Sequence, residues 1–236
     1  AEVVGAVVSG SLALLGDAGH MASDSIGLAV ALVASIVAAR PATDRHTFGF
    51  QRIEVLAALA NGLILTVVAV LVAVEAVRRL IEGAEHVDAA PMLIVAAVGL
   101  LANIIAFLVL RGGDRTSLNM RGAILEVLGD MFGSIAAIVA GIVILFTGFG
   151  PADAIASLVI AALIVPRAGI LLRDVVRVLT ESAPHDRDVE QIRAHIRSTP
   201  GVVDVHDVHI WNITSGAPVF TAHVVLDAEL FASGDT

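Results

Sequence analysis

The amino-acid sequence predicts a helical membrane protein with a smaller α+β domain at its carboxyl end. Hydrophobic residues make up 57% of the 236 residues and charged residues only 16%, which is a membrane-protein composition. Apolar runs long enough to cross a bilayer follow one another up to about residue 180. After residue 181 the apolar continuity stops, and segments with soluble-domain patterns begin. We therefore divide the chain into a transmembrane domain, residues 1–180, and a cytoplasmic domain, residues 181–236.

The apolar runs predict a bundle of six transmembrane helices. The first is short and has no initial Met or signal-peptide pattern, so we interpret residues 1–8 as the end of a truncated helix. The other five have close to, or more than, the roughly 20 residues that a bilayer requires. They are expected at residues 12–39, 52–80, 92–110, 120–146 and 152–178.

The arginines predict the orientation of the bundle. Two loops carry most of the arginines near the membrane. The loop between the second and third spans has Arg40, Arg45 and Arg52, and the loop between the fourth and fifth has Arg111, Arg115 and Arg121. Arg78 and Arg79 lie on the opposite side, but acidic residues accompany them. Positively charged loops stay in the cytoplasm, so both loops and the carboxyl-terminal domain are expected there.

The carboxyl-terminal segment has the pattern helix, strand, strand. Val189, Ile192 and Ile196 recur at helical spacing, and Thr199-Pro200-Gly201 ends that helix. Residues 202–213 and 219–227 have strand character, with a turn between them. Two strands need another layer to cover them, so this domain is also expected to be truncated.

Ionisable residues inside two of the spans predict an intramembrane metal site. Asp17, His20 and Asp24 are three and four residues apart, so they share one stripe of a helix. Glu126 and Asp130 lie four apart in a later span. A charged side chain inside a span costs roughly 2.5–3.5 kcal/mol on insertion scales, so such residues usually face the bundle interior and serve a function. Two helices with two metal-capable groups each could place four ligands around one ion.

Composition excludes several other functions. A net charge of −9 argues against nucleic acid as a partner, because phosphate binding requires a basic face. The absence of Cys excludes disulfides and thiolate zinc sites, and it disfavours Cu(I).

The residues alone also allow alternatives to transport, some of them enzymes and some not. The buried polar groups could be hydrogen-bonding links between helices, or the chain could be a non-catalytic scaffold. A di-metal carboxylate enzyme would use Glu-x-x-His on two helices, and an intramembrane metalloprotease would use His-Glu-x-x-His. The sequence contains neither motif, so we do not expect an enzyme.

Four motifs resemble those of the cation diffusion facilitator family, which are divalent-metal/proton antiporters that include zinc transporters. The motifs are Gly10–Leu15 leading into Asp17–Asp24, His46–Phe50 leading into Glu54–Ala58, Asn119–Ala123 leading to Gly129-Asp130, and Val205–Trp211. The resemblance implies a homodimer with a ferredoxin-like cytoplasmic domain, in a bacterial plasma membrane. The implied activity is export of Zn²⁺ in exchange for protons.

By this resemblance His20, Asp24, Glu126 and Asp130 correspond to the transport site. The family usually has His where this chain has Glu126, so the site here is harder than the two-His version. Zn²⁺ remains the favoured substrate, and Mn²⁺, Fe²⁺, Cd²⁺ and Co²⁺ are the alternatives.

The resemblance also implies a zinc site in the cytoplasmic domain, at a dimer interface. His206 and His223 match its positions, and further ligands would lie beyond residue 236. Strand alternation is expected to put His206 on one face with Val208 and Ile210, which makes His209 the less favoured co-ligand.

A second family site, in the cytoplasmic loop, is matched only by His46, with Asp44 as a weaker candidate beside it. Phe50 stands where some members have a further His, so we interpret His46 as a solvated loop residue.

Two more expectations concern single positions. Asp17 could line the exit path or cap the start of its helix. The resemblance also implies an ion pair between Arg52 and Glu181.

Overall fold

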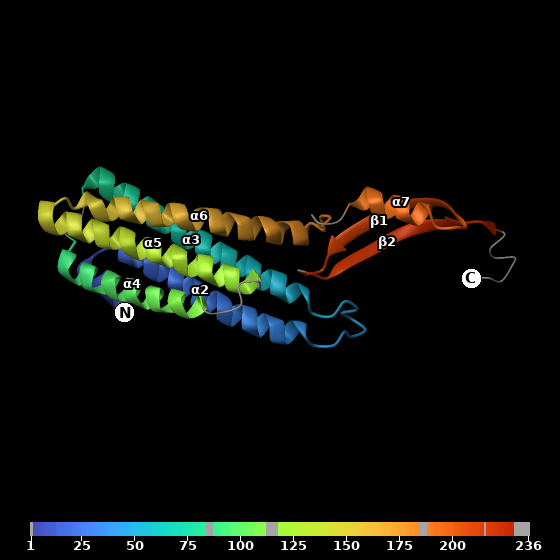
Figure 1. The fold of residues 1–236 in the computed structure, drawn as a ribbon, viewed down its shortest axis with the longest axis horizontal. Helices are drawn as coiled ribbons and strands as arrows, with labels where there is room; N and C mark the ends of the chain where they lie inside the picture. Colours follow the sequence, from blue (N-terminus) through green and yellow to red (C-terminus); the bar gives the residue numbers. More distant parts are fainter. Residues whose placement is uncertain (1, 84–86, 112–117, 185–187, 215, 229–236) are drawn as a thin grey trace. The chain divides into compact units, whose positions relative to one another are not determined.

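The computed structural model describes residues 2–83, 87–111, 118–184, 188–214 and 216–228 (Figure 1). Its helices and strands are α1 Glu2–Ser9, α2 Leu12–Ala38, α3 Arg52–Glu82, α4 Ala89–Arg111, α5 Leu118–Thr147, α6 Pro151–Leu179, α7 Val189–Arg197, β1 Val202–Asn212 and β2 Pro218–Leu226. The predicted spans are confirmed, with ends that differ by at most three residues. The predicted cytoplasmic position of Arg115 falls outside the described residues.

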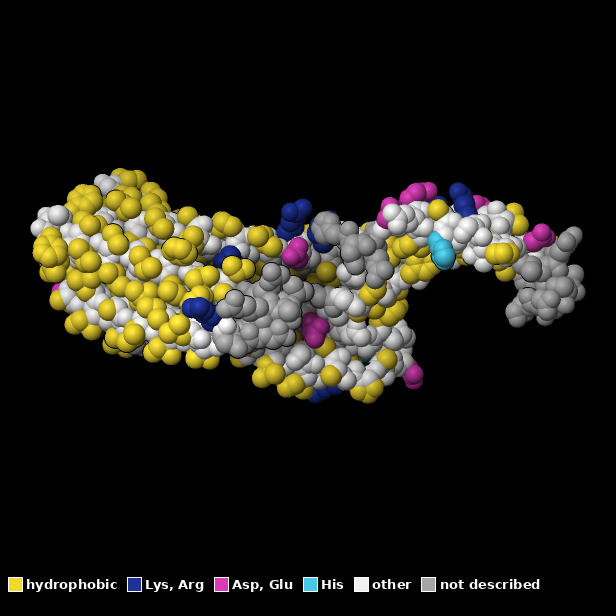
Figure 2. Space-filling view, in the orientation of Figure 1, with side chains coloured by type: hydrophobic (Ala, Val, Ile, Leu, Met, Phe, Trp, Pro, Cys, Tyr) yellow, Lys and Arg dark blue, Asp and Glu magenta, His cyan; other side chains and the backbone are white. Residues whose placement is uncertain are grey.

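Within the described residues, five helices are long and apolar enough to cross a membrane: α2, α3, α4, α6, and α5 from Ile124 onward. Hydrophobic side chains cover most of the visible face of these helices (Figure 2). Leu28 and Phe146 are 75% and 80% exposed, as expected of side chains that face lipid. The interior contacts use small residues, for example Ala13, Ala69 and Ala137, which let helix backbones approach closely.

The helix ends follow local sequence rules. Pro151 is the first residue of α6, where its fixed φ suits a helix and its missing N–H is not needed. Gly148 follows α5 with φ +67°, and its N–H donates to the Ile144 carbonyl, which closes the last turn.

The structure divides into two compact units, Ala1–Ala29 with Ala60–Leu171, and Val30–Leu59 with Leu172–Thr236. The first unit holds the membrane core, where α4 packs against both α1 and α5. The second contains residues 40–51, α7 and the antiparallel pair β1–β2. In this unit α7 packs on β1, and Asp188 caps α7 by accepting from the Glu190 N–H at 2.9 Å.

Asp153 of α6 holds the amino-terminal end of α2. This carboxylate is 1% exposed and accepts hydrogen bonds from the Leu12 N–H at 2.7 Å and the Ala13 N–H at 3.2 Å. The Ser11 hydroxyl donates to the same carboxylate at 2.5 Å and accepts from the Leu14 N–H. Charge-assisted bonds to free N–H groups of a helix start stabilise that end and complement its dipole.

The capping role considered for Asp17 is therefore wrong. Asp17 lies in the second turn of α2, and the free N–H groups precede it. Arg79 of α3 completes the connection: its Nη1 donates to the Gly10 carbonyl at 2.9 Å and lies 3.8 Å from Asp153 Oδ2. Residues of α6 and α3 thus fix where α2 begins.

The predicted ion pair between Arg52 and Glu181 is confirmed, with 2.7 Å between Arg52 Nη2 and Glu181 Oε1. Both side chains are about half exposed, at 46% and 53%. An exposed pair contributes only about 0–1 kcal/mol to stability, so its effect is mainly to position the two segments. Nearby, the Thr214 hydroxyl donates to Glu54 at 3.0 Å.

The β1–β2 register corrects the predicted strand faces. His206 lies opposite His223, and His209 lies opposite Thr221. Between these two pairs β1 advances by three residues while β2 advances by two. This is a β-bulge, and Asp207 within it has φ +49°. The extra residue places His206 on the same face as His209, whereas simple alternation had grouped it with Val208 and Ile210.

Candidate metal centre in the membrane helices

Two ligand candidates come from α2, one helical turn apart. His20 Nδ1 lies 3.2 Å from Asp24 Oδ2, and the His20 side chain is only 6% exposed. The spacing of four residues stacks the two groups on one face of α2, as the sequence predicts.

Two more ligand candidates, Glu126 and Asp130, come from α5. His20 Nε2 lies 3.6 Å from Asp130 Oδ1. The carboxyl groups of Asp24 and Glu126 are within hydrogen-bonding reach of each other. The structure therefore brings all four predicted residues together as two cross-helix pairs, with one imidazole and three carboxyl groups.

Among the described residues, several buried polar atoms of α2 and α5 lack hydrogen-bond partners, namely Asp130 Oδ1 and the hydroxyls of Ser23 and Ser134. His20 Nδ1 has its contact with Asp24 but makes no regular hydrogen bond. Unpartnered buried polar atoms are costly and usually have a functional reason. Nitrogen and carboxylate oxygen are donors that divalent ions accept, so this set fits a metal ion. Among the described residues, no three ligand atoms here lie within 4.8 Å of one another, so coordination requires the group to close further.

Arg167 of α6 also reaches this group. Its Nη1 lies 3.3 Å from His20 Nε2, and its Nη2 lies 3.9 Å from Glu126 Oε1. Gly129 of α5 leaves space for the guanidinium, because a Cβ at that position would lie 3.3 Å from Nη1. Arg167 was not among the predicted site residues, although a charged residue in the middle of an apolar span indicates a functional role.

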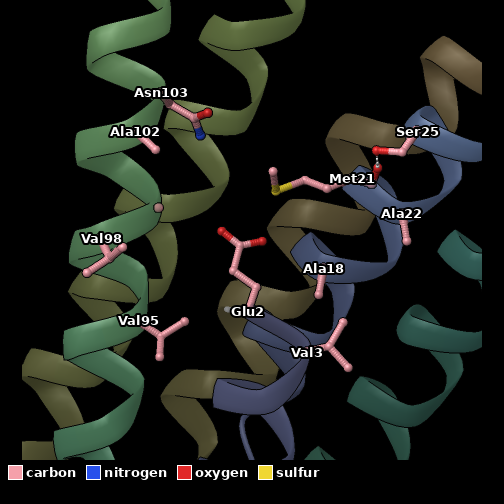
Figure 3. A pocket seen from close by; sticks show the side chains of 11 residues that line it. Glu2, Val3, Ala18, Met21, Ala22, Ser25, Val95, Val98, Ala102 and Asn103 are labelled. Atoms are coloured by element: carbon pink, nitrogen blue, oxygen red, sulfur yellow. Dashed lines mark hydrogen bonds between the residues drawn. The ribbon is translucent and has the colours of Figure 1, made fainter. Parts of the chain in front are cut away.

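Asp17 lies one turn from His20 and is 2% exposed. It packs against α5 where Gly133 has no side chain, since a Cβ there would lie 2.9 Å from Asp17 Oδ1. A pocket of about 340 Å³ lies between α1, α2 and α4, and the Glu2 carboxylate points into it beside Met21 (Figure 3). A role for Asp17 in the exit path stays a prediction.

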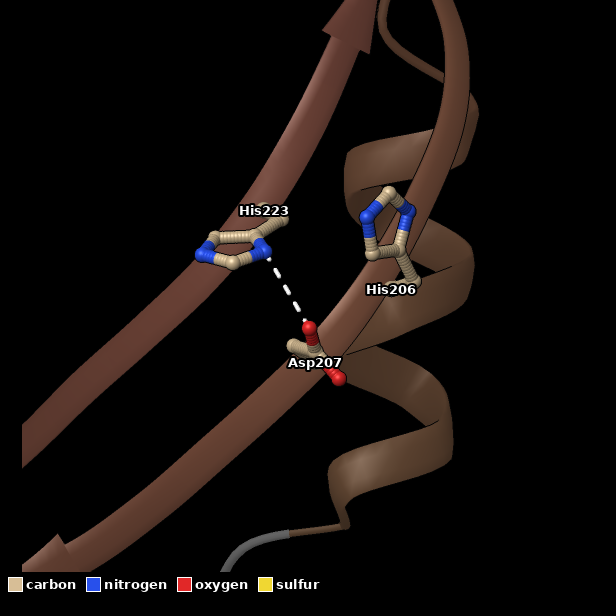
Figure 4. A group of neighbouring side chains, drawn as sticks. All are labelled: His206, Asp207 and His223. Carbon is tan, nitrogen blue, oxygen red and sulfur yellow. Dashed lines mark ion pairs between the residues drawn. The ribbon is translucent and has the colours of Figure 1, made fainter.

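A second candidate group lies on the two strands. His206, Asp207 and His223 each offer a ligand atom, and these atoms all lie within 4.8 Å of one another. His223 Nδ1 is 3.1 Å from Asp207 Oδ2, and the two imidazoles meet edge to face with centroids 5.5 Å apart (Figure 4). The histidines were predicted. Asp207 was missed because only the bulge turns its side chain toward His223.

Asp204 lies next to this group. Arg197 Nη2 donates to Asp204 Oδ1 at 3.0 Å, and this hydrogen bond holds the pKa of the Asp204 carboxyl below its usual range. The carboxylate also lies 3.3 Å from His206 Nδ1, so it orients that ring.

Sequence comparison assigns both domains. Residues 1–180 match the cation efflux transmembrane domain, and residues 184–233 match the cation efflux protein cytoplasmic domain. The chain belongs to the cation diffusion facilitator family. Members are transporters and not enzymes, so the chain is an integral, multi-pass membrane protein of divalent metal cation efflux whose carboxyl-terminal domain is cytoplasmic.

Curated relatives cover nearly the whole chain. The metal cation efflux system protein CzcD of Cupriavidus metallidurans is 43% identical over 227 residues, which are 96% of this chain and 72% of that protein. The cadmium, cobalt and zinc/H(+)-K(+) antiporter of Bacillus subtilis is 41% identical over 234 residues, 98% of this chain and 75% of the relative. The zinc transporter ZitB of Escherichia coli is 44% identical over 225 residues, 94% and 71% of the two chains.

The loop site expected from the cation diffusion facilitator resemblance finds little support in the geometry. The His46 ring packs on Phe50 with centroids 4.6 Å apart, and its Nδ1 lies 3.4 Å from the Thr43 hydroxyl. In the described part of this loop, Asp44 and His46 join no group of three converging acidic or His side chains. These neighbours favour the solvated histidine that we expected.

Proposed function

We propose that this protein exports Zn²⁺ in exchange for protons, with His20, Asp24, Glu126 and Asp130 as the transport ligands. The observation that carries the proposal is the meeting of one imidazole and three carboxyl groups from α2 and α5, with the buried Asp130 Oδ1 left without a hydrogen bond. The names of the relatives, which include a zinc transporter and a cadmium, cobalt and zinc antiporter, support it.

The exchange follows from competition for the same atoms. Metal binding requires a free imidazole lone pair and ionised carboxylates, so protons and metal exclude each other. The Asp24–Glu126 pair is a natural place to hold a proton, because two carboxyl groups can hydrogen-bond only when one is protonated. A proton from the outer, acidic side would thus help to release the ion.

Zn²⁺ suits this site because it tolerates nitrogen and oxygen ligands and distorted geometry. With one nitrogen and three carboxyl groups, the site is also open to harder ions, so Mn²⁺ and Fe²⁺ remain alternatives. Cd²⁺ and Co²⁺ are further alternatives, and both metals appear in the name of the Bacillus subtilis antiporter.

We further propose that residues 1–180 form the transport domain and residues 181–236 a regulatory and dimerising domain. The group His206, Asp207 and His223 would hold a Zn²⁺ ion there. Three exposed ligands leave coordination positions open, and a homodimer partner or a later segment could fill them.

Transport is tested with purified protein in sealed vesicles that enclose a Zn²⁺ dye. We expect Zn²⁺ flux that an opposing proton gradient accelerates, and an Asp130→Asn variant should lose at least about tenfold because one ionised ligand is removed. Asp174→Asn, at an exposed position of α6, is the matched control and should keep the parental rate. Parental flux in Asp130→Asn, or a rate that ignores the proton gradient, would contradict the proposal.

The cytoplasmic ion is tested by calorimetric Zn²⁺ titration of the full chain carrying Asp130→Asn, which weakens binding in the membrane. We expect His223→Ala to abolish the remaining binding, since it removes one of three converging ligands. His209→Ala is the control, because His209 is also exposed on β1 and on the same face. Equal binding losses in both variants would exclude a specific site.

A further inference from the structure

We propose that Arg167 is a built-in counter-cation of the transport site, which lowers metal affinity and thereby allows the ion to leave. This inference rests on the proposed function, because it assigns a role toward the transported ion. Arg167 is anchored on α6, whereas the four ligand candidates lie on α2 and α5. A third helix therefore contributes a fixed positive charge to the site.

The contacts place this charge on the ligand atoms themselves. Arg167 Nη1 is 3.3 Å from His20 Nε2, and Nη2 is 3.9 Å from Glu126 Oε1. A guanidinium only donates hydrogen bonds, so it faces the lone pair of Nε2. A metal ion bound by Nε2 would need that same lone pair. Binding therefore requires the guanidinium to withdraw from His20.

The charge balance explains why a cation is present. Three ionised carboxylates and one doubly charged ion leave one negative charge in a poorly solvated site. The single charge of Arg167 offsets it, so the loaded site is neutral. With His in place of Glu126, the loaded site would already be neutral without Arg167. Glu126 and Arg167 are thus matched in charge in this chain.

The same charge repels the incoming ion. Arginine stays protonated throughout the accessible pH range. The repulsion is therefore the same whether the site is open to the acidic or to the less acidic side of the membrane. A site with three carboxylates and no counter-cation would hold a divalent ion more tightly and release it more slowly. Arg167 therefore weakens binding of the ion and speeds its release.

The test measures Zn²⁺ affinity by calorimetry at pH 8, where proton competition is small, together with flux in vesicles. All proteins in the titration carry His223→Ala, so that the proposed cytoplasmic site does not contribute. Arg167→Gln should bind Zn²⁺ about tenfold or more tightly, because a positive charge a few ångströms from the ion is removed. Its maximal flux should fall by a similar factor. A residue with a purely structural role would instead weaken binding when replaced.

Controls separate the charge from other effects. Arg173→Gln removes the same charge from an exposed position of α6 and should change neither quantity. Arg167→Lys keeps the charge and should tighten binding much less than Arg167→Gln. Combining Glu126→His with Arg167→Gln restores neutrality of the loaded site and should return affinity toward the parental value.

Two results would overturn the inference: weaker or unchanged Zn²⁺ binding in Arg167→Gln, or equal tightening in Arg167→Lys. Either result leaves the proposed function standing if Asp130→Asn still lowers Zn²⁺ transport at least about tenfold in the parental background. If the parental protein binds and moves no divalent ion, the proposed function fails and this inference falls with it.

Discussion

Glu126→Ala should reduce Zn²⁺ transport at least a hundredfold. The substitution removes one of four proposed ligands and leaves Arg167 without the carboxylate that lies 3.9 Å away. An uncompensated positive charge would then repel the ion, in addition to the loss of coordination. Initial rates of Zn²⁺ flux in vesicles measure the effect. Glu82→Ala, an exposed acid at the end of α3, is the control and should transport normally. If Glu126→Ala moves Zn²⁺ at the parental rate, the four-ligand site is wrong.

Glu126→His separates ligand chemistry from mere packing at the same position. A second imidazole favours Zn²⁺ over harder Mn²⁺, so we expect transport to persist with a higher Zn²⁺/Mn²⁺ ratio. Affinity for both ions should fall, because two carboxylates, the divalent ion and Arg167 together would carry one net positive charge. Competition between the two ions in flux measurements reports the ratio. A ratio that is unchanged, with transport intact, would argue that residue 126 does not contact the ion.

Asp153→Ala should lower the free energy of unfolding by about 2–4 kcal/mol, because a fully buried acceptor of several charge-assisted bonds is lost. The N–H groups of Leu12 and Ala13 would lose their acceptor, and so would the Ser11 hydroxyl. Thermal loss of helical circular dichroism in detergent measures this change. Since α2 carries His20 and Asp24, we also expect transport to fall.

Asp153→Asn is the informative partner of that variant. It keeps one acceptor oxygen but removes the charge that faces Arg79 and the helix start. We expect a loss of stability between those of the parent and Asp153→Ala. A thermal midpoint of Asp153→Ala equal to the parental one would show that the α2 start is held by other contacts.

Periodicity and composition were enough to predict most of the membrane architecture. Long apolar runs permit few alternatives to spanning helices, since every backbone group must be paired within lipid. His20 and Asp24 could be predicted because a spacing of four within one helix fixes a shared face regardless of neighbours. The pair Glu126 and Asp130 followed by the same rule. That the two pairs meet was inferred from chemistry, and the structure brings them together.

The sequence by itself therefore determined the spanning segments, the face of each ligand pair and the cytoplasmic helix–strand–strand order, because these depend on local periodicity and hydropathy. Tertiary structure alone decided which distant residues join them. Arg167 enters the site through the packing of α6, and Asp153 reaches Leu12 across 141 positions of the chain. Asp207 turns toward His223 only because a bulge interrupts the strand. Contacts between distant segments and breaks in register depend on packing, which no local period encodes.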